Sequence, residues 1–210
     1  TCTPRDKTAR ELAELMVGQV LTPPAKAPKP PGPVALEVTG LSVASPNPFG
    51  TALKDVSFTL LQGEVLGIAG VAGNGQDELL LALSGEILSP EAAVKIAGQP
   101  VGRLGPNARR TLGLVAAPEE RLGHAAAPDM SLTENALLSG YVRKGFLKRG
   151  FIGWGAVEEF AQAIIKGFDV RTPGSHVAAR ALSGGNLQKF VIGREILQEP
   201  SVIVVNQPTW

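Results

Sequence analysis

Three stretches of the sequence combine residue types and spacings that suit phosphate chemistry. The first is Gly70 to Asp77 (GVAGNGQD), which follows an apolar run and precedes a segment rich in Glu and Leu. Its glycines have the spacing of a phosphate-binding loop, G-x-x-x-x-G-K-[ST]. Backbone amides turn inward in such a loop and the next helix adds positive potential at its N-terminus, so the segment is typical of a cradle for phosphate oxygens.

Two positions of this loop depart from the pattern. Gln76 stands where the lysine is expected, and Asp77 stands where a Mg²⁺-binding hydroxyl is expected. A lysine near a phosphate charge contributes about 4 kcal/mol at an effective dielectric near 20, and Gln76 lacks that attraction. Asp77 brings a negative charge towards a polyanion unless Mg²⁺ lies between them, so it is a candidate metal ligand. We therefore expect a loop that keeps its shape and binds nucleotide poorly.

Two other interpretations of the loop are a plain turn and a dinucleotide-binding motif. A plain strand-to-helix turn explains the spacing alone about equally well. A dinucleotide fingerprint, G-x-G-x-x-G, would begin at Gly73 and would need a third glycine at position 78, where the sequence has Glu78. The dinucleotide interpretation is therefore disfavoured, whereas the turn stays open on the evidence of this segment.

The second stretch is Leu182 to Lys189 (LSGGNLQK), about 110 residues after the glycine loop. Ser183 is a favourable helix N-cap, and Gly184 and Gly185 leave the amides of the first helical turn uncovered. A hydroxyl and bare amides at a helix N-terminus can bind a terminal phosphate. A simple capped helix would explain Ser-Gly-Gly in isolation, but not its position just before an apolar strand.

The third stretch is the apolar run Val202 to Val205, followed by Asn206 and Gln207. An Asp-Glu pair at this place would hold Mg²⁺ with the first carboxylate and polarise a water molecule with the second. The two amides that stand here cannot act as carboxylate bases at neutral pH. As in the glycine loop, the sequence pattern of the motif is kept while its charged residues are replaced by neutral ones.

Together and in this order, the three stretches resemble the nucleotide-binding domain of ABC transporters over residues 33–210. The glycine loop is similar to Walker A, Leu182 to Lys189 to the LSGGQ signature, and Val202 to Gln207 to a degenerate Walker B. Gly113 to Arg121 resembles the Q-loop region, with Glu119 where the family usually has Gln. The resemblance implies ATP with Mg²⁺ as cofactors. It assigns nucleotide contacts to Gly70, Gly73, Asn74, Gly75, Gln76, Asp77, Ser183, Gly184, Gly185 and Asn186, and catalytic positions to Glu119, Asn206 and Gln207.

Four further segments resemble one branch of the family, the importers of simple sugars and nucleosides that carry two fused ATPase domains. They are GVAGNGQ at residues 70–76, PEER at 118–121, PDMSLTENALL at 128–138 and QPTW at 207–210. The resemblance implies the second, C-terminal domain of a tandem ATPase, truncated after Walker B. The partners would be the first domain of the same polypeptide, membrane-spanning permease subunits and, indirectly, a solute-binding protein. The location would be peripheral, at the cytoplasmic face of the membrane.

In this family the domains pair head to tail, and each nucleotide lies between the Walker motifs of one domain and the signature of the other. An intact signature beside degraded Walker motifs therefore implies an asymmetric machine. Ser183, Gly184 and Gly185 would complete a competent site on the first domain, while this chain's own site would turn over slowly or never. The resemblance also places the family's adenine-stacking aromatic loosely at Phe49, where a role in a turn is equally compatible.

Both histidines lie outside the position of the family's switch histidine, which would follow Trp210. His124 comes after the Q-loop region and His176 before the signature, so each is expected in a surface loop. The sequence therefore supplies no switch residue of its own.

The elements that must position these residues predict an α/β fold: a P-loop core with an antiparallel β subdomain and an inserted helical subdomain, incomplete at its C-terminus. Expected strands are 34–43, 53–60, 64–70, 93–96, 112–117 and a central, fully covered strand at 201–205; expected helices are 76–83, 131–138, 156–167 and one from 183. Thr8 with Glu11 and Ser131 with Glu134 form capping boxes. The predicted organisation is a tail of a preceding domain at 1–21, a Pro-rich linker at 22–33 and the cassette at 34–210, with helices over about 119–198.

Composition narrows the alternatives. Lys plus Arg is 20 and Asp plus Glu is 19, which gives no reason to expect bulk nucleic-acid binding and disfavours an ABC-type DNA-repair ATPase. No apolar run approaches the roughly 20 residues of a membrane span. Cys2 is the only cysteine and is expected to be an inert thiol. The competing hypothesis of another class is a non-catalytic interaction module that binds little nucleotide.

Overall fold

The computed structural model describes Thr8, Glu11 and residues 30–208. The chain divides between Pro30 and Pro31 into two units. Of the first unit, the contacts of Thr8 and Glu11 are described: the amide of Thr8 donates to Glu11 Oε2 at 2.8 Å and the amide of Glu11 to Thr8 Oγ1 at 3.2 Å. The predicted capping box is confirmed, whereas most of the predicted tail and linker, with Cys2, lies outside the described residues. Gly32, predicted as linker, already bonds to Gln62 of the second unit.

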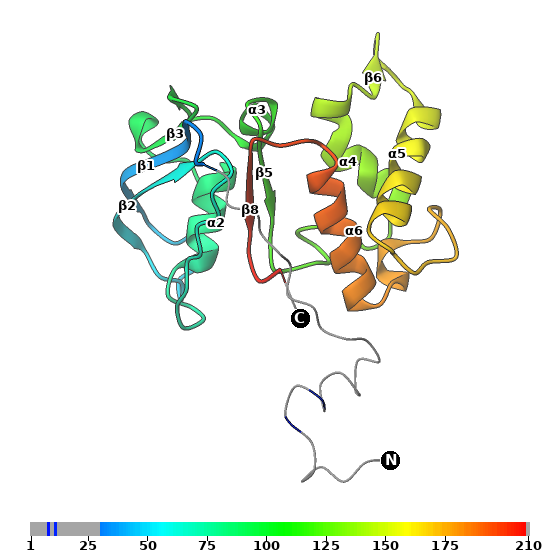
Figure 1. Ribbon diagram of the computed structural model, residues 1–210, viewed down its shortest axis with the longest axis horizontal. Helices are drawn as coiled ribbons and strands as arrows, with labels where there is room; N and C mark the ends of the chain where they lie inside the picture. Colours follow the sequence, from blue (N-terminus) through cyan, green and yellow to red (C-terminus); the bar gives the residue numbers. More distant parts are fainter. Residues whose placement is uncertain (1–7, 9–10, 12–29, 209–210) are drawn as a thin grey trace. The chain divides into compact units, whose positions relative to one another are not determined.

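An antiparallel sheet of four strands, in the order β2-β1-β3-β4, forms one side of the second unit (Figure 1). Strand β1 spans Val34–Val43 and pairs with β2 (Leu53–Leu61), and β3 (Val94–Ile96) and β4 (Gln99–Pro100) follow on its other side. Alternate residues of β1 are buried against helix α2 (Gln76–Ser84), because successive side chains of a strand point to opposite faces. The predicted strands at 34–43 and 53–60 and their antiparallel pairing are confirmed.

A parallel pair of strands joins this sheet to the helical part. Strand β5 (Leu114–Ala117) pairs in register with β8 (Val202–Val205), from Leu114 beside Val202 to Ala117 beside Val205. The prediction of a fully covered central strand at 201–205 is wrong: β8 pairs with β5 alone among the described residues, and Ile203 is 37% exposed. An apolar strand is covered on both faces only where further strands and helices flank it.

The predicted buried strand at 64–70 is also wrong. Residues 64–70 have no strand structure, and Val65 and Ile68 are 82% and 52% exposed. An apolar run becomes a strand only when a neighbouring strand accepts its backbone hydrogen bonds, and none of the described strands pairs with this run. Its sequence pattern is that of a strand, but the partner that would complete it is not among the described residues.

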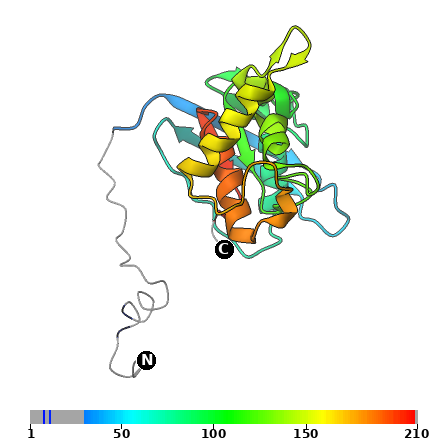
Figure 2. The ribbon, with the colours of Figure 1, turned by 90° about the vertical axis from the view of Figure 1, so that its right-hand side faces the viewer.

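Three helices and a small hairpin build the remaining part, which faces the viewer in Figure 2. Helix α4 (Leu132–Lys144) begins at the predicted capping box of Ser131 and runs further than the predicted end near Leu138. Helices α5 (Trp154–Gly167) and α6 (Gly184–Ile196) confirm the two other predicted helices. The remaining short elements were not predicted: α3 (Pro106–Thr111), η2 (Glu91–Ala93), η3 (Ala179–Ala181), β6 (Leu147–Lys148) and β7 (Phe151–Ile152).

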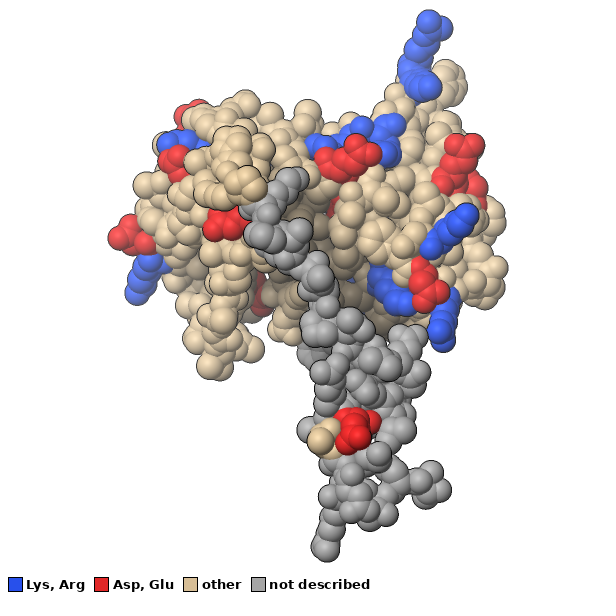
Figure 3. Space-filling model, in the orientation of Figure 1, with Lys and Arg blue, Asp and Glu red and all other residues tan. Residues whose placement is uncertain are grey.

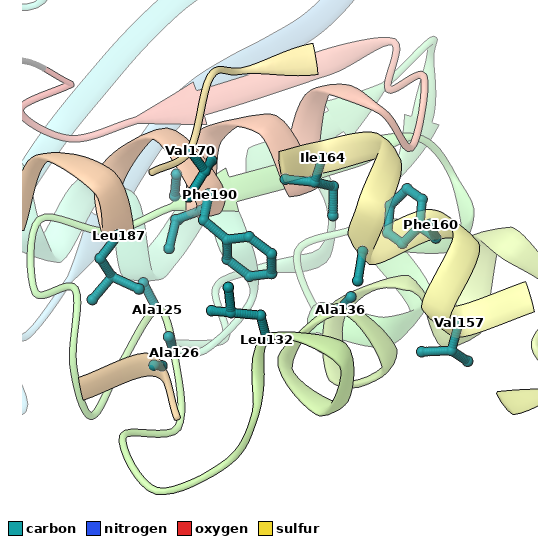
Figure 4. Packing of buried hydrophobic residues seen from close by; sticks show 14 of the residues in the cluster. Ala125, Ala126, Leu132, Ala136, Val157, Phe160, Ile164, Val170, Leu187 and Phe190 are labelled. Carbon is teal, nitrogen blue, oxygen red and sulfur yellow. The ribbon is translucent and has the colours of Figure 1, made fainter. Parts of the chain in front are cut away.

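The helices pack around an apolar centre. Phe190 of α6 lies between Leu132 of α4 and Ile164 of α5, and all three are fully buried (Figure 4). Residues 157, 160, 161 and 164 share one face of α5 because a helix repeats every 3.6 residues, and this face is the buried one. Helix α6, which begins at the signature, is therefore anchored along its length.

In the part of the chain that the structure describes, no helix is long and apolar enough to cross a membrane.

Candidate functional site

The glycine loop lies between the unpaired run at 64–70 and the start of α2. Gly73 and Gly75 adopt positive φ angles of 85° and 100°, which side chains rarely tolerate, and Gly75 is the residue before the helix. Thr51 donates its hydroxyl to the carbonyl of Gly73 at 2.7 Å and so ties the loop to the start of β2. The loop thus has the turn geometry that the glycine spacing predicted.

The side chain of Gln76 folds back into this loop. Its Nε2 donates to the carbonyl of Val71 at 3.1 Å, and its Oε1 accepts the amide of Asn74 at 3.1 Å. Asn74 also donates to the Val71 carbonyl at 3.3 Å. A phosphate-binding loop offers such amides to its ligand, whereas here the loop's own glutamine and carbonyl already engage one of them.

Two carboxylate–amide pairs follow from the substitutions noted in the sequence. Asn206 Nδ2 donates to Asp77 Oδ1 at 2.6 Å, and Gln207 Nε2 donates to Glu119 Oε2 at 2.9 Å. The structure thus brings together the ends of β8 and β5 and the first turn of α2. A hollow of about 620 Å³ opens beside Asp77, Glu119 and Asn206, and its lining includes Arg121 and His124.

These residues fit a Mg²⁺–nucleotide poorly. Asp77 and Glu119 present negative charge where a polyphosphate would lie, and Gln76 supplies no positive charge. One carboxylate oxygen of Asp77 already accepts a hydrogen bond from Asn206. Among the described residues, no three His, Cys, Asp or Glu side chains are grouped to hold a metal ion. The loop's residues therefore support no chemical step of their own, and Asp77 as an Mg²⁺ ligand stays a prediction.

Glu78 holds the loop's surroundings in place. Its Oε1 accepts the Ser45 hydroxyl at 2.8 Å and the Thr51 amide at 3.1 Å. Burial raises the pKa of Glu78, but these hydrogen bonds outweigh burial and lower it overall. Nearby Phe49, the predicted adenine-stacking position, is 97% exposed.

The signature residues lie apart from this hollow, at the start of α6. Ser183, Gly184 and Gly185 are exposed, as expected. Ser183 is the N-cap residue, but its side chain makes no bond to a helical amide; instead Asn186 Nδ2 donates to Ser183 Oγ at 3.0 Å. Asn186 in turn accepts the amide of Arg171 at 2.9 Å, so this first turn is oriented from the preceding loop.

The loop after β5, residues 118–125, contacts both regions. Glu119 pairs with Gln207, and His124 Nε2 lies 2.8 Å from Glu86 Oε2, just beyond the end of α2. Arg121 Nη1 lies 2.5 Å from where a Cβ at Gly184 would be, so the guanidinium lies beside the first residue of α6. One loop therefore connects α2, β8 and the signature helix. His124 does lie in a loop, as predicted, and so does His176, which is 84% exposed.

Sequence reasoning missed a buried arginine that supports α2. Arg109 is fully buried, and its guanidinium donates to the carbonyls of Ala82 and Leu83 at 2.5 and 2.9 Å and to those of Gly102 and Leu104 at 3.0 and 2.8 Å. Burial lowers its pKa to about 10. A cation at a helix C-terminus satisfies carbonyls that have no helical partner. The only available signal was an arginine in an otherwise ordinary segment, which does not distinguish it from a surface residue.

Known proteins resemble this chain over most of its length. The family model described as ABC transporter matches residues 53–210. The chain is 37% identical over 206 residues to the guanosine import ATP-binding protein NupO of Bacillus subtilis, and 34% over 205 residues to the nucleoside import ATP-binding protein NupA of Lactococcus lactis. It is 34% identical over 202 residues to a ribose import ATP-binding protein of Rubrobacter xylanophilus. These matches cover 95–98% of this chain and 39–40% of the relatives, so the chain spans about two fifths of their length.

Solved structures agree on the fold. The nucleotide-free ATP-binding cassette of an ABC transporter superposes with a TM-score of 0.62 at 20% identity, covering 84% of this chain and 70% of that one. The cassette MJ0796, in a dimeric post-hydrolysis state bound to ADP and phosphate, gives 0.67 at 20% identity over 83% and 75%. With the family match over residues 53–210, the chain belongs to the ABC transporter family and has the α/β fold of its ATP-binding cassettes.

Proposed function

We propose that this chain is the second, C-terminal nucleotide-binding domain of the ATP-binding subunit of a nucleoside or simple-sugar importer. The resemblance of its sequence to relatives named for guanosine, nucleoside and ribose import supports this assignment. The domain would act with a first domain of the same polypeptide and with membrane-spanning permease subunits at the cytoplasmic face, and indirectly with a solute-binding protein.

The observation that carries the division of labour is the side chain of Gln76. It bridges Val71 and Asn74 inside the glycine loop, whereas Ser183, Gly184 and Gly185 are exposed and make no side-chain cap. A loop that engages its own amides binds phosphate weakly, and a helix N-terminus with free amides binds it well. We assign to this domain a degenerate Walker site and an intact signature that completes the site of the first domain.

The assignment is tested in the full transporter with two variants. Ser183→Arg places a long cation in the signature and is expected to reduce transport-coupled ATPase activity at least 100-fold. Gln76→Ala removes only the bridge within the degenerate loop and is expected to leave turnover within about twofold. Unchanged turnover in Ser183→Arg would refute the role of the signature.

The same bridge also favours the competing function, a non-catalytic interaction module with little affinity for nucleotide. Titration of the full transporter with ATP and Mg²⁺ separates the two. One nucleotide per subunit, lost in Ser183→Arg, supports the signature role. Binding that is insensitive to Ser183→Arg supports the module.

A further inference from the structure

The hairpin of β6 and β7 is a small rigid projection on the helical part. Leu147 pairs with Ile152 and Lys148 with Phe151, and the two residues of the turn, Arg149 and Gly150, have positive φ angles of 51° and 85°. Such a two-residue turn suits the twist of a hairpin. Figures 1 and 2 both show it extending beyond the helices.

The base of this hairpin is fixed to the protein core. Phe146, directly before β6, is 4% exposed and packs on Phe160 of α5 with ring centroids 5.6 Å apart. The amide of Gly153 donates to the carbonyl of Phe146 at 2.9 Å and closes the hairpin where α5 begins. The tip is thus held in a defined position.

The tip exposes apolar side chains that the fold does not use. Phe151 is 79% exposed, Trp154 49% and Leu147 48%. They lie within eight consecutive residues. Leu147 and Phe151 are on the hairpin, whereas Trp154 begins α5 and lines a hollow beside Glu134 and Glu158. Clustered aromatic side chains at a protruding surface indicate an interaction site more often than solitary exposed ones do.

Charge is concentrated in the same segment. Residues 135–157 contain four Lys or Arg and no Asp or Glu, whereas the whole chain has 20 basic and 19 acidic residues. Arg143 donates to the carbonyl of Gln198 and Lys144 to that of Leu197, so these two cations serve the fold. Among the described residues, Lys148 and Arg149 have no ion-pair partner, and basic side chains project from this end in Figure 3.

We propose that the β6–β7 tip docks on an anionic lipid surface. Aromatic side chains at headgroup level beside unpaired cations are the combination that binds such surfaces. A convex tip has no pocket to define a peptide, whereas a bilayer needs none. The proposal is independent of the ATPase assignment, because it concerns the hairpin and no nucleotide.

Fluorescence of Trp154 tests the proposal directly. Residues 1–210 contain two tryptophans, Trp154 and Trp210. A variant of the full protein in which every tryptophan except Trp154 is replaced by Phe leaves Trp154 as the sole emitter. In this background, vesicles of equal phosphatidylcholine and phosphatidylglycerol at millimolar lipid are expected to shift its emission to shorter wavelength, and vesicles of phosphatidylcholine alone are not. Adding 0.5 M salt shortens the screening length to about 4 Å and should reverse much of the shift.

Variants locate the interaction. Lys148→Glu with Arg149→Glu is expected to weaken partitioning about 20-fold or more, from about fivefold per cation. Phe151→Ser should also weaken it without changing charge. The matched control is Lys54→Glu with Arg103→Glu, one exposed lysine and one exposed arginine on the four-stranded sheet and beyond β4. Equal loss in the control, no shift with anionic vesicles, or binding only to vesicles that contain the permease would each overturn the proposal.

Discussion

The helical part and the glycine-loop side of this domain satisfy their polar groups in different ways. In the helical part, Glu195 of α6 accepts from Ser139 of α4 and pairs with both Arg110 and Arg194. On the other side, the loop closes on itself through Gln76, and the apolar run before it is exposed. The contrast teaches that the helical part contains a buried network of charged side chains, while the loop side is held by a few local bonds. Substitutions in the two regions should therefore differ greatly in how much they lower the free energy of unfolding.

The largest effect is expected from Glu195→Ala. Burial raises the pKa of Glu195, but Arg194 and Arg110 outweigh it and lower the pKa overall, so the carboxyl is ionised. Its removal leaves Arg194, which is 5% exposed, without a carboxylate, and breaking a buried pair costs about 3–5 kcal/mol. Urea denaturation measures the loss. The control is Glu37→Ala, whose solvent-screened pair with Lys95 should contribute little to stability. Equal losses in the two variants would contradict the contrast.

Arg109→Met comes next, at about 2–4 kcal/mol, because four carbonyls at and beyond the end of α2 lose their donors. The arginine belongs to the sheet side, so this variant tests whether that side contains one deep anchor. Arg103→Met, at an exposed arginine, is the control and should cost less than about 0.5 kcal/mol. A loss below about 1 kcal/mol for Arg109→Met would show that water replaces the guanidinium.

Glu158 gives the helical part a dependence on pH. The hydroxyls of Ser175 and Thr133 and the amide of Gln162 lower its pKa to about 2. Because the folded pKa lies below the unfolded value near 4.5, the stabilisation is present above pH 5 and is lost as the pH falls towards 2. Solvent screening limits it to about 1 kcal/mol.

The measurement compares unfolding free energies at pH 6 and pH 3. Glu158→Gln should lose less stability over this range than the wild-type chain, by about 1 kcal/mol. Glu159→Gln, at the exposed neighbouring position, should follow the wild type. If all three proteins lost the same unfolding free energy between pH 6 and pH 3, Glu158 would not be the source of the pH dependence.

The sequence predicted best what neighbouring residues decide. The capping box of Ser131 and Glu134 and the helix expected at 156–167 depend on residues three or four positions apart, and both are found. The strand expected at 64–70 depends on a distant partner strand, and periodicity alone does not reveal whether one is present. Likewise, nothing local indicates that Asn206 meets Asp77, 129 positions away. The fold class was therefore accessible, and the pairings within the candidate site were not.

The smallest effect on stability is expected from a substitution on the glycine-loop side. Thr51→Val removes the hydroxyl that donates to Gly73 and keeps the shape of the side chain. Because this bond is exposed, water replaces it, and the global free energy of unfolding should fall by less than about 1 kcal/mol. Amide hydrogen exchange at Asn74 and Gly75 should nevertheless accelerate, since these amides open locally rather than with the whole domain. If exchange there stays as slow as in α6, the loop is as firmly integrated as the helical part, and the contrast between the two regions fails.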